Sequence, residues 1–218
     1  MKTNAILQQD VIAELSFEPS IDARNIGVVA TDGVITLSGT VPTFPDKRGA
    51  EQAAERVRGV RAVADETSVD LPSLHRRNDQ EIAAAAVNAL SWQVTVPDDS
   101  IKVQVEEGWL TLDGSVEQEF QRHAALEAVR HLMGVRGVEN CIAIKPLIDG
   151  TDLKVKIEDA LKRSATLEAA AIEVSVTGNE VDLSGSVRSW TERNDADRAA
   201  WSASGVRTVN NNLKVVTE

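Results

Sequence analysis

Residues 34–41 read VITLSGTV, and closely similar stretches stand at residues 109–116 (WLTLDGSV) and 180–187 (EVDLSGSV). In each stretch apolar residues alternate with other residues, and a glycine and a valine close the pattern. Alternation with a period of two indicates a strand that buries one of its faces. The occurrence of this pattern at three places indicates an internal repeat, which decides the fold.

The repeat extends beyond this stretch in both directions. Residues 7–69 align without a gap with residues 82–144 and with residues 153–215. Chance would give about one position, or fewer, that is identical in three such segments. In the first copy the identical positions are Leu15, Ile26, Val28, Leu37, Gly39, Val41, Ala50, Ala53, Gly59, Val60, Arg61 and Val63. The chain is therefore a triplication of one unit.

Each copy predicts the same order of elements. A first helix comes first, and its apolar residues recur at helical spacing in the second copy: Ile82, Ala86, Val87 and Leu90. A hairpin follows, because two alternating runs flank residue pairs that tolerate positive φ, such as Asp32-Gly33 and Glu107-Gly108. A second helix with an alanine-rich inner face and a third strand complete the unit.

Glycines recur at two further places in each copy, and both predict a turn. One glycine follows the second strand, and the other stands where a left-handed residue would end the second helix. Glycine suits both places because it reaches positive φ without steric cost. The six structural turn glycines are Gly39, Gly114, Gly185, Gly59, Gly134 and Gly205.

These patterns predict an α+β protein of three tandem αββαβ units. Each unit is expected to form a three-stranded mixed sheet that two helices cover on one face. We place the units at residues 4–71, 78–146 and 150–217. A unit of about 65 residues has little core of its own. We therefore expect the copies to pack on one another.

Tandem units of this length and element order resemble the BON domain family. The resemblance rests on the three strand-glycine-valine stretches, each followed by Gly-Val-x-x-Val, and it covers nearly the whole chain. It implies a bacterial, non-enzymatic binding module. Members of the family occur in osmotically induced and envelope-stress proteins, where some act on phospholipid surfaces and others through protein contacts. Many are exported to the periplasm, frequently with two copies.

Composition limits the partners that this chain can take. Lys and Arg number 23 and Asp and Glu 34, which leaves a formal net charge of -11. Such a chain repels nucleic acid and anionic lipid unless a local basic patch intervenes, and we predict no nucleic-acid binding. No apolar run approaches the length of about 20 residues that a transmembrane helix needs. The start of the chain as given shows no secretory signal, so we expect a cytoplasmic protein, or a periplasmic one if a signal was removed.

The sequence contains no constellation typical of an enzyme. Neither a Gly-x-Gly-x-x-Gly nor a Gly-Lys-Ser/Thr phosphate loop occurs. His123 and His131 lie two helical turns apart, which is too far for a shared metal ion. The single cysteine, Cys141, excludes an internal disulfide. We predict no catalytic residue, no cofactor and no metal site.

Arginine is the charged residue that all three copies share, at Arg61, Arg136 and Arg207. Two roles fit it. The guanidinium can bind a phosphate or a carboxylate. Alternatively, it pairs with a neighbouring acid, or its aliphatic stem packs at the end of the second helix. We favour the second, structural interpretation.

Tryptophan is the other candidate contact residue. Trp109 follows the hairpin turn, and Trp201 stands where the other copies have Glu55 and Arg130. A tryptophan at a position that elsewhere suits solvent indicates a contact between copies, a partner site or a membrane anchor. Trp92, which aligns with Phe17 at the end of the first helix, is expected to pack locally.

Two hypotheses for function follow from the resemblance. In the first, the chain is a non-catalytic binding protein of the bacterial osmotic or envelope stress response that contacts proteins through the surfaces of its units. In the second, it binds phospholipid surfaces peripherally, through the partly basic first helix of the third copy or an exposed tryptophan. The sequence leaves the partner and the oligomeric state open.

Overall fold

A computed structural model describes residues 2–97, 100–145, 152–164, 167 and 169–216. Positions 146, 150 and 217, which bound the predicted units, lie outside the described residues. Within the described part of the chain, no helix is both long and apolar enough to cross a membrane.

Each unit has the predicted order of elements. The first contains α1 (Asn4–Phe17), β1 (Ile26–Thr31), β2 (Val34–Val41), α2 (Phe44–Arg56) and β3 (Ala62–Val69). A short 3-10 helix, η1 (Ser73–His75), leads to α3 (Asp79–Ser91), β4 (Ile101–Glu106), β5 (Trp109–Val116), α4 (Glu119–Arg130) and β6 (Gly137–Ile144). The third unit contains α5 (Leu153–Arg163), η2 (Ala169–Ala171), β7 (Ile172–Thr177), β8 (Glu180–Val187), α6 (Trp190–Trp201), β9 (Thr208–Asn211) and β10 (Lys214–Val215).

The fold class is confirmed, because each unit is a small mixed sheet with helices on one face. In the first unit β2 is central and pairs antiparallel with β1 and parallel with β3. The parallel pair needs a crossover connection, and α2 provides it. Fully buried side chains of the central strands face the helices: Ile35, Leu37, Leu110, Leu112, Val181 and Leu183.

The helices bury narrow apolar stripes on the sheets. In α3 the buried residues are Ile82, Ala86 and Leu90. Val87, which the sequence pattern placed on the same stripe, is 58% exposed, so that prediction is wrong. Val87 lies next to the stripe. Because α3 contains few polar residues, the sequence pattern could not separate its buried face from its exposed face.

The predicted hairpin turns are present. Asp32 and Gly33 have φ of 50° and 84°, and Glu107 and Gly108 have φ of 50° and 81°. Positive φ at both central residues matches the twist of a two-residue hairpin. In the second unit the carboxylate of Asp79, the first residue of α3, accepts from the backbone N–H groups of Glu107 and Gly108, at 2.9 Å each. The first helix thus holds the hairpin tip.

Gly39, Gly114 and Gly185 lie within β2, β5 and β8, so the prediction that they form turns is wrong. Their φ values are 109°, 142° and 116°. A Cβ atom at Gly39 would stand 2.0 Å from the carbonyl oxygen of Asn25, just before the neighbouring strand. The glycines are needed because the two strands approach too closely here for a side chain, and a strand interior can accommodate that only at glycine.

Gly59, Gly134 and Gly205 lie in turns, but not at the helix caps where we placed them. Helix α2 ends at Arg56, and the backbone N–H of Val60 donates to the carbonyl of Val57 at 3.1 Å. Gly59, with φ of 107°, is therefore the third residue of a separate four-residue turn. The helix ends before the glycine because the chain must turn back toward the sheet.

An Asp or Asn in the third strand organises each unit, and sequence comparison missed it. Asp65, Asn140 and Asn211 coincide in the repeat, and the side-chain oxygen of each accepts from the backbone N–H two residues later, at 2.9, 3.2 and 3.3 Å. The residue changes between copies while its hydrogen bond persists. A comparison that counts identities therefore overlooks it.

A basic residue of the second helix meets this position in every unit. Lys47 lies 3.2 Å from the carboxylate of Asp65, and the backbone carbonyl of Arg122 accepts from Asn140 at 3.2 Å. In the third unit the guanidinium of Arg193 donates to the carbonyls of Asn211 and Leu213. There the third strand is split into β9 and β10, which both pair with β8.

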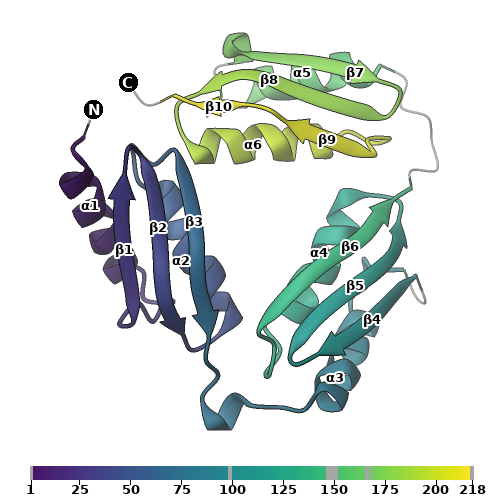
Figure 1. Cartoon of the computed structure of the whole chain (residues 1–218). Coiled ribbons are helices and arrows are strands. Elements are labelled where there is room, and N and C mark those ends of the chain that lie inside the picture. The colour runs from purple at the N-terminus through teal and green to yellow at the C-terminus, as the bar shows by residue number, and fades with distance from the viewer. Residues whose placement is uncertain (1, 98–99, 146–151, 165–166, 168, 217–218) are drawn as a thin grey trace.

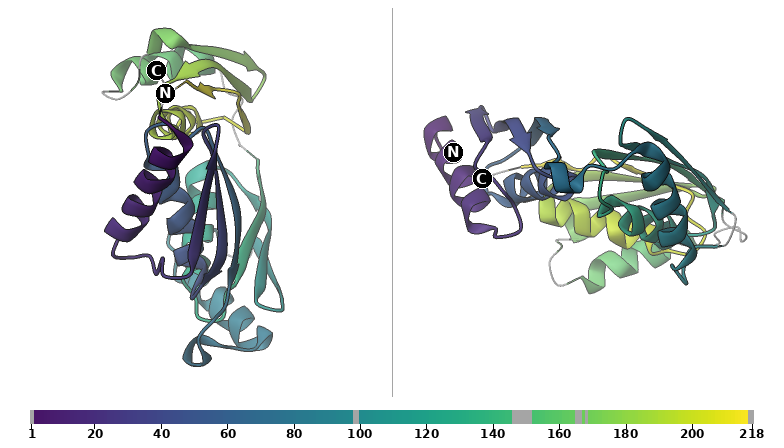
Figure 2. Two further views of the ribbon diagram at one scale, coloured as in Figure 1. Left: turned by 60° about the vertical axis from the view of Figure 1, so that its left-hand side comes forward. Right: turned by 90° about the horizontal axis from the view of Figure 1, so that it is seen from below.

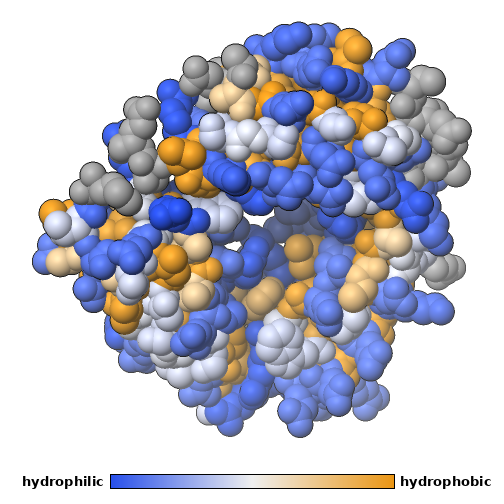
Figure 3. All heavy atoms as spheres, turned by 45° about the horizontal axis from the view of Figure 1, so that its top comes forward, coloured by the Kyte–Doolittle hydropathy of each residue, from blue (hydrophilic) through white to orange (hydrophobic). Residues whose placement is uncertain are grey.

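The three units form a triangle, with successive units turned relative to one another (Figure 1). The open faces of the sheets point to the same side in Figure 1, and α1, α3 and α5 lie toward the outside. The further views in Figure 2 show the sheets and the helices as separate layers. The surface is hollowed where the units meet, and hydrophilic residues surround the hollow (Figure 3).

The glycine inside the strand gives a test of this fold. We expect Gly39→Ala to lower the free energy of unfolding by more than about 2 kcal/mol, because a left-handed φ alone costs roughly 1–2 kcal/mol and the clash adds to it. Gly27→Ala, on the paired strand, is the control, since its Cβ would meet the flexible Ser38 hydroxyl at 3.0 Å. Urea unfolding followed by circular dichroism measures both. Equal losses in the two variants would contradict this account of Gly39.

Candidate functional site

The units meet head to tail, through the same part of the repeat each time. The first residue of the second helix is Phe44, Glu119 or Trp190, and these three positions coincide in the alignment. Each lies where its unit meets another: the first meets the second, the second meets the third, and the third meets the first. These three joints are the surfaces on which the units recognise one another.

The joint between the first and second units is apolar. Phe44 is 8% exposed and belongs to the hydrophobic core of the second unit, although it is part of α2. Val69, at the end of β3, packs against the same core. Burying an aromatic side chain contributes on the order of 1.5–3 kcal/mol, so this joint is well anchored.

Trp201 fills the joint between the second and third units. Its side chain is half-buried and packs against the cores of both units. The guanidinium carbon of Arg122 lies 5.0 Å from the centroid of the indole, which is a cation–π distance. The Gln118 amide donates to the Ser204 hydroxyl at 3.4 Å. Of the three roles that the sequence left open for Trp201, the structure places it in contact between copies.

The joint between the third and first units is more open. Helices α2 and α6 contact each other, and Trp190 stacks under Arg193, whose guanidinium carbon is 5.2 Å from its ring centroid. A cavity of about 490 Å³ remains, lined by residues 55–60 of the first unit and by residues 188–192 and Val216 of the third. The contact between the third and first units completes the triangle, but it leaves this cavity between them.

Both joints of the third unit contain a glutamate whose pKa is raised. Burial raises the pKa of Glu119, and Asp197 of α6 adds to the effect, while Arg122 and His123 oppose it. Burial also raises the pKa of Glu55, as does Glu51, while Arg48 and Arg193 oppose it. Across the joints, Asp197 of the third unit therefore disfavours the charged form of Glu119, whereas Arg193 of the third unit favours the charged form of Glu55.

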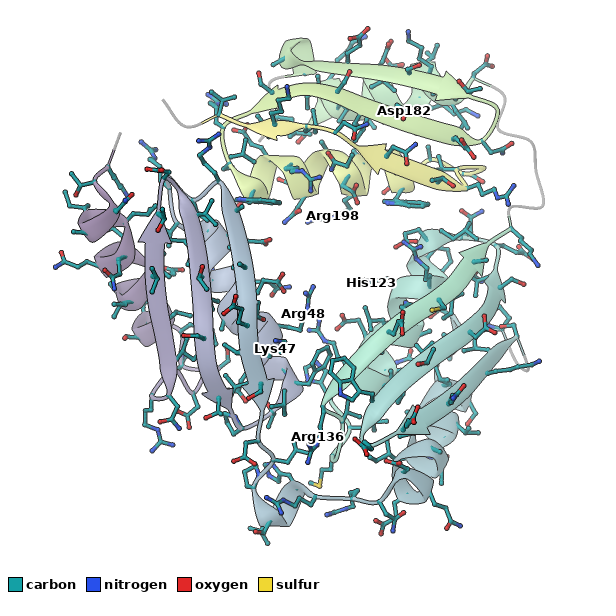
Figure 4. The ribbon with its side chains drawn as sticks, viewed as in Figure 1. Lys47, Arg48, His123, Arg136, Asp182 and Arg198 are labelled. Atoms are coloured by element: carbon teal, nitrogen blue, oxygen red, sulfur yellow. The ribbon has the colours of Figure 1, made fainter. Side chains whose placement is uncertain are left out.

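The charges that face the middle of the triangle are compensated locally. Arg48 and Arg198 extend from α2 and α6 toward the space between the units (Figure 4). Arg48 pairs with Glu51 one turn away, and Arg198 lies 3.2 Å from Asp195. Pairs of this kind are solvated and contribute little net attraction for a ligand.

The repeated arginines hold the hairpin turns. The backbone N–H groups of Arg61, Arg136 and Arg207 donate to Gly33, Gly108 and Asn179 at 2.7, 2.9 and 2.8 Å. The stems of Arg61 and Arg136 also lie directly over the turn glycines, where a Cβ atom would collide with them or press against them. Packing of the aliphatic stem, which we favoured, therefore occurs in two of the three copies, next to the hairpin turn.

Trp109 is exposed on the open face of the second sheet. It alternates with the buried Leu110 and Leu112, so it points away from the helices. Its ring lies across Gly137 of β6, where a Cβ atom would be 2.3 Å from the indole. The indole is 57% exposed. The sheet thus presents a flat aromatic surface.

Trp92 is 80% exposed and Phe17 is 83% exposed, so the prediction that Trp92 packs locally is wrong. The indole N–H of Trp92 donates to the Asn88 side chain at 3.1 Å, and otherwise its ring faces solvent. The core position at the end of α3 belongs to Leu90 instead. Sequence alignment could not distinguish the two because the helix ends between them.

The residues that the structure describes bring together no group of three or more His, Cys, Asp or Glu that would hold a metal ion. His123 lies 3.6 Å from Glu127 on the same helix. His131 accepts from the Arg130 side chain at 3.0 Å. Each histidine therefore contacts a nearby side chain at the protein surface.

The fold and these joints define a class of protein: tandem small α+β units that contact one another through the ends of their second helices. Comparison with known families agrees. The family model of the BON domain matches residues 3–70, 78–146 and 149–217. The chain belongs to the BON domain family, as the resemblance indicated.

Similarity to individual proteins is more distant. The chain is 27% identical over 146 residues to Osmotically-inducible protein Y of Escherichia coli (strain K12), a match that covers 62% of this chain and 69% of that protein. Two solved structures of CdsD, a structural protein of the Type III secretion system of Chlamydia trachomatis, are 17% identical to it. They cover 98% and 99% of this chain, and 93% and 100% of their own, with TM-scores of 0.28 and 0.27.

The raised pKa of Glu119 predicts a pH dependence. In the folded protein the pKa is above its ordinary value, so the charged carboxylate lowers the stability of the fold, and this stability rises as pH falls from the raised pKa toward the ordinary one. We expect Glu119→Gln to remove part of this gain. Thermal unfolding between neutral pH and the ordinary glutamate range measures it.

Glu117→Gln is the matched control, because it removes the same charge two residues away at an exposed position. We expect Glu117→Gln to keep the pH dependence of the unmodified chain. If both variants followed the same curve as the unmodified chain, the assignment of this effect to Glu119 would be wrong.

Proposed function

We propose that the chain is a non-catalytic binding protein of the bacterial osmotic or envelope stress response, and that it contacts proteins through the surfaces of its BON units. Family membership and the similarity to an osmotically inducible protein support a role in stress. The observation that carries the binding role is Trp109, an exposed aromatic ring that lies across Gly137 on an open sheet face. Tryptophan is enriched at the energetic centres of protein interfaces.

The residues that all three copies share have structural roles, and this supports a function without catalysis. Gly39 permits close approach of two strands, Gly59 forms a turn, and Arg61 holds the hairpin. Leu37 fills the core. These residues, which all three copies share, thus serve folding, whereas Trp109, which the other copies lack, is exposed.

The surroundings of Trp109 suit a protein partner. On the open face of the first sheet, Val29, Thr36 and Ala64 lie side by side on the three strands. Small uncharged side chains leave this face flat. On the second sheet, which points to the same side (Figure 1), Trp109 is paired with Glu106 on the neighbouring strand, so a protein partner would meet an aromatic ring beside a charge.

The first helix of the third unit gives little support to lipid binding. Lys154 lies 3.8 Å from Glu158, and Lys162 lies 3.5 Å from Asp159. Its cations are therefore partly compensated by acids on the same helix. With a net charge of -11, attraction to an anionic membrane through this helix is weak.

A photo-crosslinking amino acid at position 109 tests the proposal in cells. We expect it to form discrete adducts with protein when the medium is raised to high osmolarity. The control places the same amino acid at position 92, which is more exposed than position 109 (80% against 57%) but lies at the end of α3. Adducts of equal pattern and yield at both positions, or none at position 109, would count against this surface.

A further inference from the structure

The open face of the second sheet carries a carboxylate on each strand beside its exposed tryptophan. Trp109 of β5 stands opposite Glu106 of β4 and opposite Gly137 of β6. Two residues further along β5, Thr111 stands opposite Glu139 of β6, on the same face. Diagonal neighbours on one face of a sheet are within reach of an aromatic side chain. Glu106, Trp109 and Glu139, which we call the Trp109 cluster, therefore form one surface.

No cation of the sheet neutralises the two carboxylates of the Trp109 cluster. Both are exposed, and among the residues that the structure describes neither has an ion pair or a side-chain hydrogen bond. Lys102 lies on the same face, but it stands opposite Asp113, four residues along β5 from the tryptophan. The stem of Arg136 packs at the hairpin turn, in a cavity that Asp79 and Glu107 also line. The two carboxylates are thus free to pair with a cation from outside.

The other two units provide an internal comparison, because they lack all three residues of the Trp109 cluster. The equivalent positions hold Thr31, Val34 and Ala64 in the first unit, and Thr177, Glu180 and Asn210 in the third. Both of those units form the same sheet. The fold therefore does not require the aromatic ring or its two carboxylates. They occur together in one unit only, which indicates a shared role at the surface.

Negative charge extends from the Trp109 cluster to the third sheet. The open faces of the second and third sheets point to the same side (Figure 1), and Figure 4 labels Asp182 on this side of β8. The strands of these two faces carry six acids, Glu106, Asp113, Glu139, Glu173, Glu180 and Asp182, and two lysines, Lys102 and Lys214. The whole chain has 34 acidic and 23 basic side chains. Acids are therefore concentrated on these faces.

The chain itself shows how its tryptophans take part in contacts. An arginine covers the ring of each tryptophan at the joints of the third unit: Arg122 lies 5.0 Å from the centroid of Trp201, and Arg193 lies 5.2 Å from that of Trp190. Among the described residues, no lysine or arginine lies over Trp109 in this way. Its exposed ring is thus available to a cation from another molecule.

We propose that the Trp109 cluster binds a segment rich in lysine or arginine on a partner protein; this inference rests on the protein contact proposed above for Trp109. A cation over an indole is attracted by the electrons of the ring, and the neighbouring carboxylates can pair with the same or the next cation. The acidic faces around the cluster speed the approach of such a segment.

Charge also argues against other kinds of partner at this surface. Nucleic acid and acidic segments are repelled by the carboxylates. An apolar partner would cover Glu106 and Glu139 without pairing them, and burial of an unpaired charge is costly. A basic segment is the partner that satisfies the ring and both carboxylates at once.

Peptides of defined charge test the inference on the full chain. The probe is a labelled peptide of alternating lysine and serine, and the comparison peptides have glutamine or glutamate in place of lysine. Fluorescence anisotropy at low ionic strength measures binding. We expect the lysine peptide alone to bind, and its affinity to fall as salt is added, because salt screens exposed charges.

Variants of the Trp109 cluster show whether the peptide binds there. Trp109→Leu keeps an apolar side chain but removes the aromatic ring, and we expect it to weaken binding about threefold or more. Glu106→Gln combined with Glu139→Gln is expected to weaken it about fivefold or more, because two charge pairs are lost. Circular dichroism confirms that each variant is folded.

Two matched controls make the same substitutions elsewhere. Glu66→Gln removes an exposed carboxylate from the open face of the first sheet, and Trp92→Leu removes an exposed tryptophan at the end of α3. Each is expected to change the affinity less than about twofold, because exposed charges at a distance are screened and Trp92 lies outside the sheet face.

Binding that falls in the cluster variants but not in the two controls supports the inference. It is overturned if the lysine peptide does not bind, if the glutamine peptide binds equally well, or if the controls lose as much affinity. In those cases crosslinks at position 109 would still support a protein contact, with a partner that is not basic. Absence of such crosslinks with peptide binding intact would count against the contact in cells, and not against the preference for a basic segment.

Discussion

A unit of about 65 residues buries too little apolar surface to be stable by itself, and the head-to-tail contact between units is how this chain meets that constraint. The first residue of each second helix lies at the joint with the next unit, and at both joints of the third unit it faces the C-terminal end of the neighbouring second helix. A contact of this heterologous kind either continues indefinitely or closes into a ring. With three units, each turned from the last, it closes (Figure 1). The ring shape therefore follows from one contact that is used three times.

The three contacts differ in chemistry, and this sets how firmly each unit is held. Phe44 lies in the core of the second unit, which fastens the first two units together. At the equivalent position Glu119 brings a half-buried carboxylate to the joint with the third unit. Trp190 leaves a cavity beside it. The third unit is thus joined by more polar contacts on both of its sides.

The same arrangement separates the surfaces of the molecule by role. The second helices face the middle of the triangle, where they recognise one another, while the open sheet faces stay free on one side. Trp109 belongs to such a free face. Divergence outside the shared residues has therefore given the units distinct surfaces on one common frame.

The sequence by itself determined the unit, because period-two strands, helical stripes and hairpin turns are local patterns that each copy repeats. It located the six glycines but misassigned the local structure around them, because the close approach of Gly39 to the carbonyl of Asn25 is a contact between strands that a pattern of side chains does not report. It also missed Asp65 and its equivalents, because an Asp and an Asn make the same hydrogen bond without being identical.

Only the tertiary structure decided which units touch and through which residues. Contacts between units have no periodicity, and Phe44, Glu119 and Trp190 look unrelated until the chain folds. Local patterns report local backbone preference, whereas these juxtapositions come from the burial of surface between distant segments.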